Sequence, residues 1–393
     1  MTGHNMELVD CLTLSSILNH RTQREARLGK LDKIRIKGFR SIKDQTVALG
    51  PINILIGGNG SGKSNFIEAF KLLREISEGR LTEYVKRSGG ADRILHFGTK
   101  ETESLQFKAY FNDSVDQYEI SLEPTDLSGL IPMREVASYW NKSYPQPYNK
   151  SLSSFGGEAA ISGDNVDGVS SYVKTALSSW RVYHFHDTGP SSPMKKVAEL
   201  DDNRFLRPDG SNLASFLYYL KQAHEPEYNL IRGAIRRVAP FFDDFVLEPR
   251  ALDETRIRLE WKHSSSDAFF DVASFSDGTL RFIALAVLLL QPTEFRPSVI
   301  LVDEPELGLH PAAITLLGAM VRQASDKGQV ILSTQSPFLL DHFAPEEVIV
   351  ADREDGTSVF TRLESVTLTE WLEDFSLGEL WEKNELGGRP RGS

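Results

Sequence analysis

The most informative stretch of the sequence is a glycine-rich turn that ends in lysine and serine. It follows alternating apolar residues at 52–56 and precedes apolar residues at helical spacing, so it should join a strand to a helix. Glycines let the backbone curl around a phosphate, and N–H groups at a helix start attract anions. The spacing predicts a phosphate-binding loop made of Gly57, Gly58, Asn59, Gly60, Ser61, Gly62, Lys63, Ser64 and Asn65.

Two side chains of this loop have expected roles. Lys63 is placed to reach the β- and γ-phosphates of ATP, and the Ser64 hydroxyl is placed to ligate Mg²⁺. The alternative is a flexible Gly-Ser turn without a ligand. The motif is rare at average composition, so nucleotide binding is the preferred interpretation.

A second pair of candidate residues follows an apolar run. Residues 299–302 are Val-Ile-Leu-Val, and Asp303 and Glu304 come next, which is typical of a buried parallel strand that delivers carboxylates to a ligand crevice. We expect Asp303 to hold Mg²⁺ through water beside Ser64, and Glu304 to polarise an attacking water. Acids after strands are common, so it is the conjunction with the phosphate loop that favours a hydrolytic site.

Composition narrows the class of protein. The 393 residues are 40% hydrophobic and 25% charged, which allows one large domain or two lobes. The net charge of −11 disfavours a protein coated in DNA-binding charge but leaves a local basic groove open. The single cysteine excludes an intramolecular disulfide. Without a long apolar run or signal-peptide regions, the sequence predicts a cytoplasmic protein with no membrane partner.

The order of motifs resembles a known family. After the phosphate loop come Ser276-Asp277-Gly278-Thr279, the Asp-Glu-Pro strand end, residues 306–311 and residues 333–337. This order is similar to the ABC-type ATPase heads of the RecF, SMC and OLD-like group. It most resembles compact bacterial predicted ATPases of the AAA family without a coiled coil, several relatives of which serve in anti-phage systems.

The resemblance covers residues 31–388 and implies a fold and a site. The fold is α/β: a P-loop NTPase with an ABC-type ATPase head, in which a mixed sheet is flanked by helices beside a smaller helical lobe. The opening Gly-Phe-Arg-Ser places Arg40 among the expected nucleotide-binding residues. Ser276, Asp277 and Gly278 stand where the family has a signature loop that contacts the γ-phosphate held by the other subunit. A head-to-tail homodimer, or a higher homo-oligomer, is therefore implied.

Gln335 departs from the family pattern, because many relatives have a γ-phosphate-sensing histidine there. Glutamine can donate a hydrogen bond but cannot carry a proton. Gln335 is therefore expected to assist catalysis by polar contact, with Glu304 as the base. The lobe-connecting glutamine of the family has no clear counterpart, and His186 and Asp187 are candidate substitutes.

Composition and periodicity along the chain also predict how it is divided. Residues 1–29 should be an N-terminal extension, either a frayed tail or a docking helix. Residues 30–188 should form the first part of the ATPase lobe, with a loop-rich insertion at about 123–179. Residues 189–272 should form the helical second lobe, and residues 273–393 the second part of the ATPase lobe.

These features predict a Mg²⁺-dependent ATPase that serves as sensor or regulatory subunit of a bacterial anti-phage defence complex. The effector, a nuclease or toxin, would be a separate protein, because Asp352, Glu354 and Asp355 lack the density of a Toprim nuclease and should lie on a hairpin turn. Two alternatives stay open. One is a RecF-like DNA repair or recombination ATPase that clamps DNA, and the other is a scaffold that binds ATP without hydrolysing it.

Overall fold

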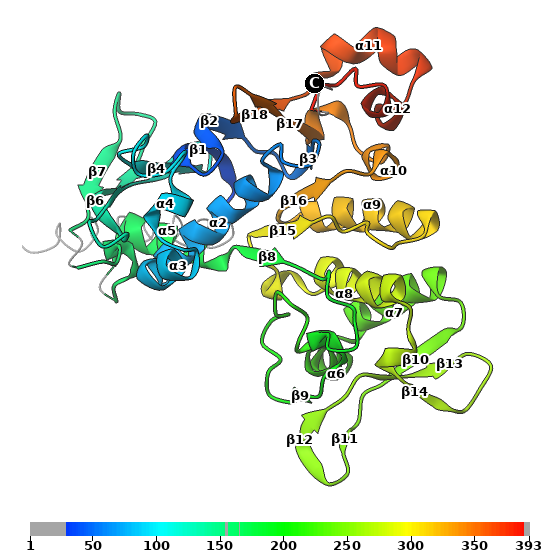
Figure 1. Cartoon of the computed structure of the whole chain (residues 1–393). Coiled ribbons are helices and arrows are strands. Elements are labelled where there is room, and N and C mark those ends of the chain that lie inside the picture. The colour runs from blue at the N-terminus through cyan, green and yellow to red at the C-terminus, as the bar shows by residue number, and fades with distance from the viewer. Residues whose placement is uncertain (1–28, 154–155, 165, 389–393) are drawn as a thin grey trace, which may run out of the picture.

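The computed structural model describes residues 29–153, 156–164 and 166–388, so nearly all of the expected N-terminal extension lies outside the described residues. Within these ranges the strands form two six-stranded sheets and two three-stranded sheets. Figure 1 shows the two large sheets in the upper half of the molecule and the smaller sheets at the bottom. The larger sheets and the helices between and below them position the motifs.

One large sheet carries the motif strands and has the order β18-β17-β3-β16-β15-β8. Five of its strands run parallel, and β18 pairs antiparallel with β17. Both faces are buried, since Ile54 faces one core and Leu55 faces the other. The strands are β3 (Ile52–Ile56), β8 (Arg181–Tyr183), β15 (Val299–Asp303), β16 (Gln329–Thr334), β17 (Val348–Glu354) and β18 (Thr357–Arg362).

The other large sheet is antiparallel and has the order β2-β1-β4-β5-β6-β7. Helix α2 (Lys63–Ser77) packs between the two sheets, with Phe66 and Phe70 in one core with side chains of both. The buried Gln329 side chain ties the sheets together by accepting from Leu31 N at 2.7 Å and donating to Leu31 O at 2.8 Å. The strands are β1 (Leu31–Phe39), β2 (Ile42–Ala48), β4 (Leu105–Phe111), β5 (Asp116–Pro124), β6 (Leu130–Tyr139) and β7 (Tyr148–Ser151).

The segment 123–179 is more regular than the loop-rich insertion that the sequence predicts. It contains β6, β7 and helix α5 (Gly168–Ser179). One of the polar side chains of this segment, the Glu135 carboxylate, is buried. Glu135 accepts from Tyr118 Oη at 2.9 Å and from Ile161 N at 2.9 Å, and burial raises its pKa. Hydrogen bonds from distant residues therefore allow a polar strand to occupy the interior.

The expected helical lobe also contains strands. Helices α6 (Leu213–Ala223) and α7 (Glu225–Val238) accompany two small sheets, β10-β13-β14 and β11-β12-β9. Helices α8 (Asp277–Leu290) and α9 (Pro311–Ser325) bury their apolar faces in the same core as α6 and α7, beneath the parallel sheet. The strands are β9 (Ala198–Glu199), β10 (Phe242–Val246), β11 (Pro249–Arg250), β12 (Asp253–Ile257), β13 (Glu260–His263) and β14 (Phe269–Asp271).

Five short helices complete the described structure. They are α3 (Leu81–Arg87), α4 (Ala91–Ile94), α10 (Pro337–Leu340), α11 (Ser365–Asp374) and α12 (Leu377–Glu382). Figure 1 places α11 and α12 together at the outer end of the parallel sheet, above α10. None of the helices in the described ranges has the length and apolar character needed to cross a membrane.

Candidate nucleotide-binding and hydrolysis site

The phosphate loop connects the end of β3 to the start of α2, as the sequence predicts. Gly62 immediately precedes the helix with a φ of 109°, in the left-handed region that favours glycine. A Cβ at Gly62 would collide with the Ser358 hydroxyl, and a Cβ at Gly57 would collide with the Ala351 carbonyl. The loop is therefore pressed against the β17–β18 hairpin, which leaves no space for side chains at these two positions.

Lys63 lies along the loop and close to the carboxylates that follow β15. Its Nζ donates to the carbonyl oxygens of Gly57 at 2.6 Å and Gly58 at 3.2 Å. Burial lowers the pKa of Lys63, and the negative charges of Glu304 and Asp303 oppose this effect. The structure thus brings the lysine of the first motif and the acids of the second together.

Asp303 and Glu304 reach this edge because β15 pairs with β16 and β16 pairs with β3, all in parallel. The Ser333 hydroxyl donates to Asp303 Oδ1. Glu304 has a φ of 42°, unusual for a residue with a side chain, and its N–H donates to Ser333 O at 2.9 Å. The Gln335 side-chain amide donates to Glu304 Oε1. Gln335 therefore lies where it can orient the carboxylate.

A third acid, Glu306, was not among the candidate residues. Its side chain is only 8% exposed, and burial raises its pKa. It accepts from Thr334 Oγ1 at 2.5 Å and from Gln335 N at 3.2 Å. Glu306 therefore fixes the backbone that carries Gln335. The only local signal for it is a further acid two residues after Glu304.

Arg40 and Asn65 also lie together beside the loop. Arg40 Nη1 donates to Asn65 Oδ1 at 3.4 Å, and Arg40 Nη2 lies 3.6 Å from Glu68 Oε2. Asn65 Nδ2 donates to Ser41 Oγ at 2.7 Å. Arg40 Nε is buried and has no hydrogen-bond partner among the described residues. The arrangement leaves part of this guanidinium free for an anion at the loop.

The residues of the expected signature loop begin α8. Ser276 caps the helix by accepting from Thr279 N at 3.2 Å, and Asp277 lies 3.8 Å from Lys195. Among the described residues, the hydrogen-bond and ion-pair partners of these two side chains lie outside the phosphate loop. Gly278 packs so closely on Gly308 that a Cβ would collide with the Gly308 carbonyl.

Arg281, which the motif analysis did not select, joins three segments at this point. Its guanidinium donates to Phe185 O at 3.0 Å, to His186 O at 3.2 Å and to Leu307 O. Arg281 thereby fixes the start of α8 against the end of β8 and the loop after β15. The sequence shows no pattern for it, because all three acceptors are backbone carbonyls.

The two candidate substitutes for the lobe-connecting glutamine have local roles. The His186 carbonyl accepts from Arg281, and the Asp187 carboxylate accepts from Gly189 N at 3.2 Å. His184 is nearer to the site. It follows Tyr183, which pairs with Val302, and Asp303 follows Val302 on the neighbouring strand. Burial lowers the pKa of the His184 imidazole, and the charge of Asp303 opposes this effect.

Comparisons with known proteins show the family of the chain. The family model described as "AAA domain, putative AbiEii toxin, Type IV TA system" matches residues 52–341. The chain belongs to this AAA-domain family. The matched range holds the phosphate loop, the Ser276–Gly278 segment, Asp303, Glu304 and Gln335.

Curated relatives of this AAA-domain protein include Old nuclease of Escherichia phage P2, at 24% identity over 84% of this chain and 60% of that relative. The chain thus matches about 60% of the length of Old nuclease. The DNA replication and repair protein RecF of Salmonella paratyphi A is 29% identical over 27% of this chain and 32% of its own length.

Solved structures show the same fold. An SMC head bound to the C-winged helix domain of ScpA has a TM-score of 0.56 at 18% identity, covering 86% of this chain and 99% of its own. An SMC head domain derived from Pyrococcus furiosus has a TM-score of 0.54 at 15% identity, covering 88% of this chain and 99% of its own. The predicted ABC-type ATPase head of the RecF, SMC and OLD-like group is confirmed.

The residues present fit ATP and Mg²⁺. The buried Ser61 hydroxyl has no hydrogen-bond partner among the described residues. Ser64 and Asp303 supply a hydroxyl and a carboxylate, and Mg²⁺ takes such oxygen ligands together with water and substrate phosphates. The described ranges contain no group of three His, Cys, Asp or Glu side chains arranged around a metal. A cation here would therefore depend on the nucleotide and water for its remaining ligands.

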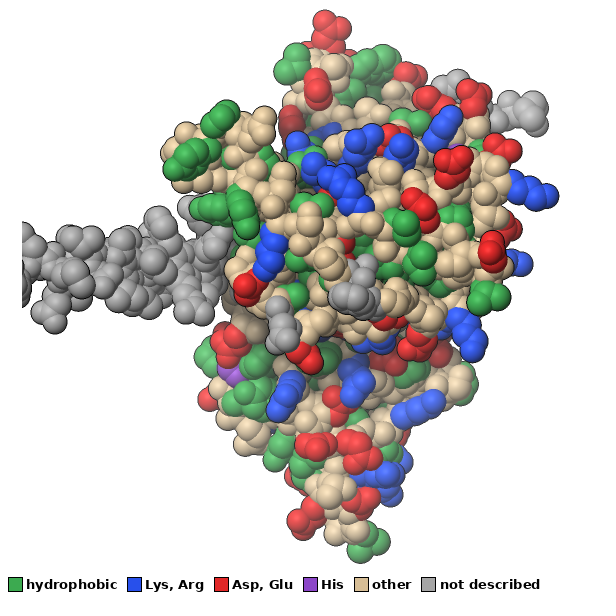
Figure 2. Space-filling model, turned by 90° about the vertical axis from the view of Figure 1, so that its left-hand side faces the viewer, with side chains coloured by type: hydrophobic (Ala, Val, Ile, Leu, Met, Phe, Trp, Pro, Cys, Tyr) green, Lys and Arg blue, Asp and Glu red, His purple; other side chains and the backbone are tan. Residues whose placement is uncertain are grey.

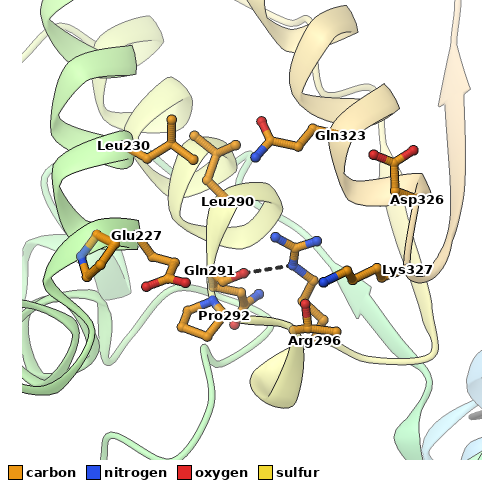
Figure 3. Close-up of a pocket in the computed structure, with 11 residues that line it drawn as sticks. Glu227, Leu230, Leu290, Gln291, Pro292, Arg296, Gln323, Asp326 and Lys327 are labelled. Carbon is orange, nitrogen blue, oxygen red and sulfur yellow. Dashed lines mark hydrogen bonds between the residues drawn. The ribbon is translucent and has the colours of Figure 1, made fainter. Parts of the chain in front are cut away.

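A separate pocket of about 340 Å³ lies at the opposite edge of the parallel sheet (Figure 3). It is bordered by the end of α8, the start of α7 and the end of α9, and Arg296 donates to Gln291 O at 2.7 Å within it. None of the predicted site residues lines it. Concavity alone would therefore point away from the phosphate loop.

Proposed function

We propose that this protein binds ATP with Mg²⁺ and hydrolyses it, using Glu304 as the general base. The observation that carries the proposal is the meeting of Lys63, Glu304 and Gln335 at one edge of the parallel sheet. Hydrolysis of ATP needs a cation at the phosphates, oxygen ligands for Mg²⁺ and a group that positions and activates water. The motif residues supply each of these groups.

The roles of the residues follow from their contacts. Lys63 exchanges the Gly57 and Gly58 carbonyls for oxygens of the β- and γ-phosphates when ATP binds. Glu304 accepts the proton of the attacking water, and Gln335 keeps the Glu304 carboxylate in place. Mg²⁺, when held by Ser64 and Asp303, supplies neutralisation of the charge that develops on the phosphates.

We further propose that the active form is a head-to-tail homodimer, or a higher homo-oligomer built on it. Ser276 is exposed at the start of α8, where the N–H groups and the helix dipole favour an anion. Among the described residues its hydrogen-bond partner is Thr279 of its own helix turn, so it stays available to a nucleotide on a second subunit. Two subunits would then enclose two ATP molecules, each between Lys63 of one and Ser276 of the other.

Mixing two inactive variants tests the shared site. Lys63→Ala removes the loop cation, and Ser276→Arg places a bulky group at the signature. In a mixed dimer both defects fall in one site and the other site is intact, so random mixing should restore about a quarter of wild-type phosphate release. If activity stays absent while mass spectrometry detects mixed dimers, each site is contained in one chain and the dimer proposal is wrong.

The cellular role that we propose is that of a sensor or regulatory ATPase in a bacterial anti-phage defence complex with a separately encoded nuclease or toxin. Support comes from the family description as a putative AbiEii toxin system and from the similarity to Old nuclease of a phage. Co-purification of the partner from the native operon, compared with and without phage challenge, tests this role.

A DNA-clamping ATPase is the second candidate, and a basic sheet face favours it. Alternation along β1 directs Lys33, Arg35 and Lys37 away from the buried Ile34 and Ile36. Figure 2 shows Lys and Arg side chains grouped, with Asp and Glu side chains among them, in the upper part of the face that it views. Such a cluster on a chain of net charge −11 is suited to a phosphate backbone.

Charge reversal on β1 distinguishes the two candidates. If DNA binds this face, Lys33→Glu combined with Lys37→Glu should weaken binding of duplex DNA at least about tenfold. The slope of log affinity against log salt concentration should fall by the equivalent of about two phosphate contacts. Fluorescence anisotropy across a salt series measures both. Lys262→Glu, in the small lobe on β13, is the control and should leave binding unchanged. Failure of the wild-type protein to bind DNA rejects this candidate.

A further inference from the structure

The chain that follows α12 returns to the phosphate loop. Gly58 N–H donates to the Gly388 carbonyl at 2.6 Å, and Gly388 N–H donates to Asp352 Oδ2 at 3.2 Å. The other oxygen of Asp352 accepts from Arg353 N at 2.7 Å. Two hydrogen bonds therefore link the loop to Asp352 of β17 through a single glycine.

Gly388 fits its place closely. Its φ is 77°, and a Cβ would lie 2.8 Å from Val350 Cγ1 and 3.0 Å from the Ala351 carbonyl oxygen. Ala351 is also the residue whose carbonyl excludes a side chain at Gly57. The loop and the returning segment thus pack on the same stretch of β17, so a shift of one displaces the other.

Helix α12 is attached to the catalytic side of the site as well. Gly378 N donates to Asp341 Oδ1 at 2.6 Å, and a Cβ at Gly378 would lie 2.5 Å from the Pro337 carbonyl oxygen. Pro337 begins α10, two residues after Gln335. The segment 377–388 therefore spans from the residues beside Gln335 to the phosphate loop.

These contacts fix parts of the loop that do not hold phosphate. The Gly58 N–H is already engaged, which leaves the N–H groups at the start of α2 to face an anion. Arg353, from the same strand as Asp352, donates to the Gly60 carbonyl at 3.4 Å. Two neighbouring residues of β17 thereby restrain both halves of the turn, which is the preorganisation that a phosphate site needs.

We propose that residues 377–388 are a positioning element of the nucleotide site, and that Asp352 is a positioning residue that raises affinity for ATP by holding Gly388 against Gly58. The inference rests on the proposed ATP-binding function. Asp352 acts on the loop before ATP arrives and contacts no reacting atom. Because α11 and α12 lie at the outer end of the sheet (Figure 1), a displacement of α12 would reach the loop through the same contacts.

Asp352→Ala tests the positioning role. We expect the dissociation constant of Mg·ATP, measured by calorimetry, to rise about tenfold, because a hydrogen bond to a charged acceptor is lost. KM for ATP should rise by the same factor while kcat at saturating ATP changes less than about twofold. Asp352→Asn keeps an acceptor oxygen and should recover most of the affinity. Glu354→Ala removes an exposed acid from the same strand and should have no effect.

A second variant changes Gly388, the other partner in the hydrogen bond with Asp352. Gly388→Ala should weaken ATP binding as Asp352→Ala does, and the double variant should be no weaker than the worse single one, because both break one chain of contacts. Unchanged affinity in Asp352→Ala, a loss that Asn does not restore, or an equal loss in Glu354→Ala overturns the positioning role. A wild-type protein that binds no ATP would instead refute the proposed function.

Discussion

We expect the affinity for ATP to fall by about a hundredfold or more when Lys63 is replaced with alanine. The ammonium of Lys63 is the cation that lies on the loop itself, and it is close enough to Asp303 and Glu304 for their charges to act on it. Without it, the β- and γ-phosphates would face these carboxylates with no loop cation between them. Calorimetric titration with Mg·ATP measures the change.

Lys86→Ala provides the matched control for this substitution, because Lys86 is exposed on the short helix α3. We expect that variant to bind ATP as the wild-type protein does. Equal affinity in Lys63→Ala and the wild-type protein would show that the glycine-rich turn does not bind the nucleotide.

We expect ATP hydrolysis to slow by about a hundred- to ten-thousandfold when Glu304 is replaced with glutamine, while ATP stays bound. The amide has the size of the carboxylate, and its oxygen can still accept the hydrogen bond from Gln335, but it cannot take a proton from water. ATP-bound dimers should therefore accumulate. Single-turnover phosphate release and native mass spectrometry measure the two effects.

The variant Glu306→Gln tests whether Glu304, and not the nearby Glu306, acts as the base. Glu306 is buried and accepts hydrogen bonds from Thr334 Oγ1 and Gln335 N, and a glutamine of the same size keeps an acceptor oxygen for these contacts. We expect this variant to lose far less activity than Glu304→Gln. Wild-type turnover in Glu304→Gln would assign the proton transfer to another group and leave Asp303 with its expected role at the metal.

The parts of the site that the sequence predicts are those encoded by local spacing. The strand, turn and helix around Lys63 follow from apolar periodicity and from glycines that have no room for a Cβ. The apolar run before Asp303 likewise has the composition of a strand buried on both faces. Neither pattern contains the pairing of β15 with β16 and of β16 with β3, which the structure shows.

The residues that sequence reasoning missed act through contacts between distant segments. Arg281 binds carbonyls about 95 residues away, and Glu306 holds the end of β16. Asp352, which we expected on a hairpin turn, lies within β17 and accepts from Gly388 N. In the segment 123–179, Glu135 is a charged residue in a core strand, and such residues are more typical of an exposed loop. No local pattern marks these residues, because their partners are mostly backbone groups.

The strand order of the parallel sheet also affects how the chain folds during its synthesis. Asn53, on the strand that precedes the phosphate loop, donates to the Val330 carbonyl 277 residues further along the chain. During synthesis, β3 and the phosphate loop would leave the ribosome long before β16 and β17, the two strands that flank β3 in the sheet. Pairings across such separations form slowly, since the entropy of closing the loop is lost before the contacts are gained. ATP would therefore bind, and stabilise, only chains that have folded almost to their last strand.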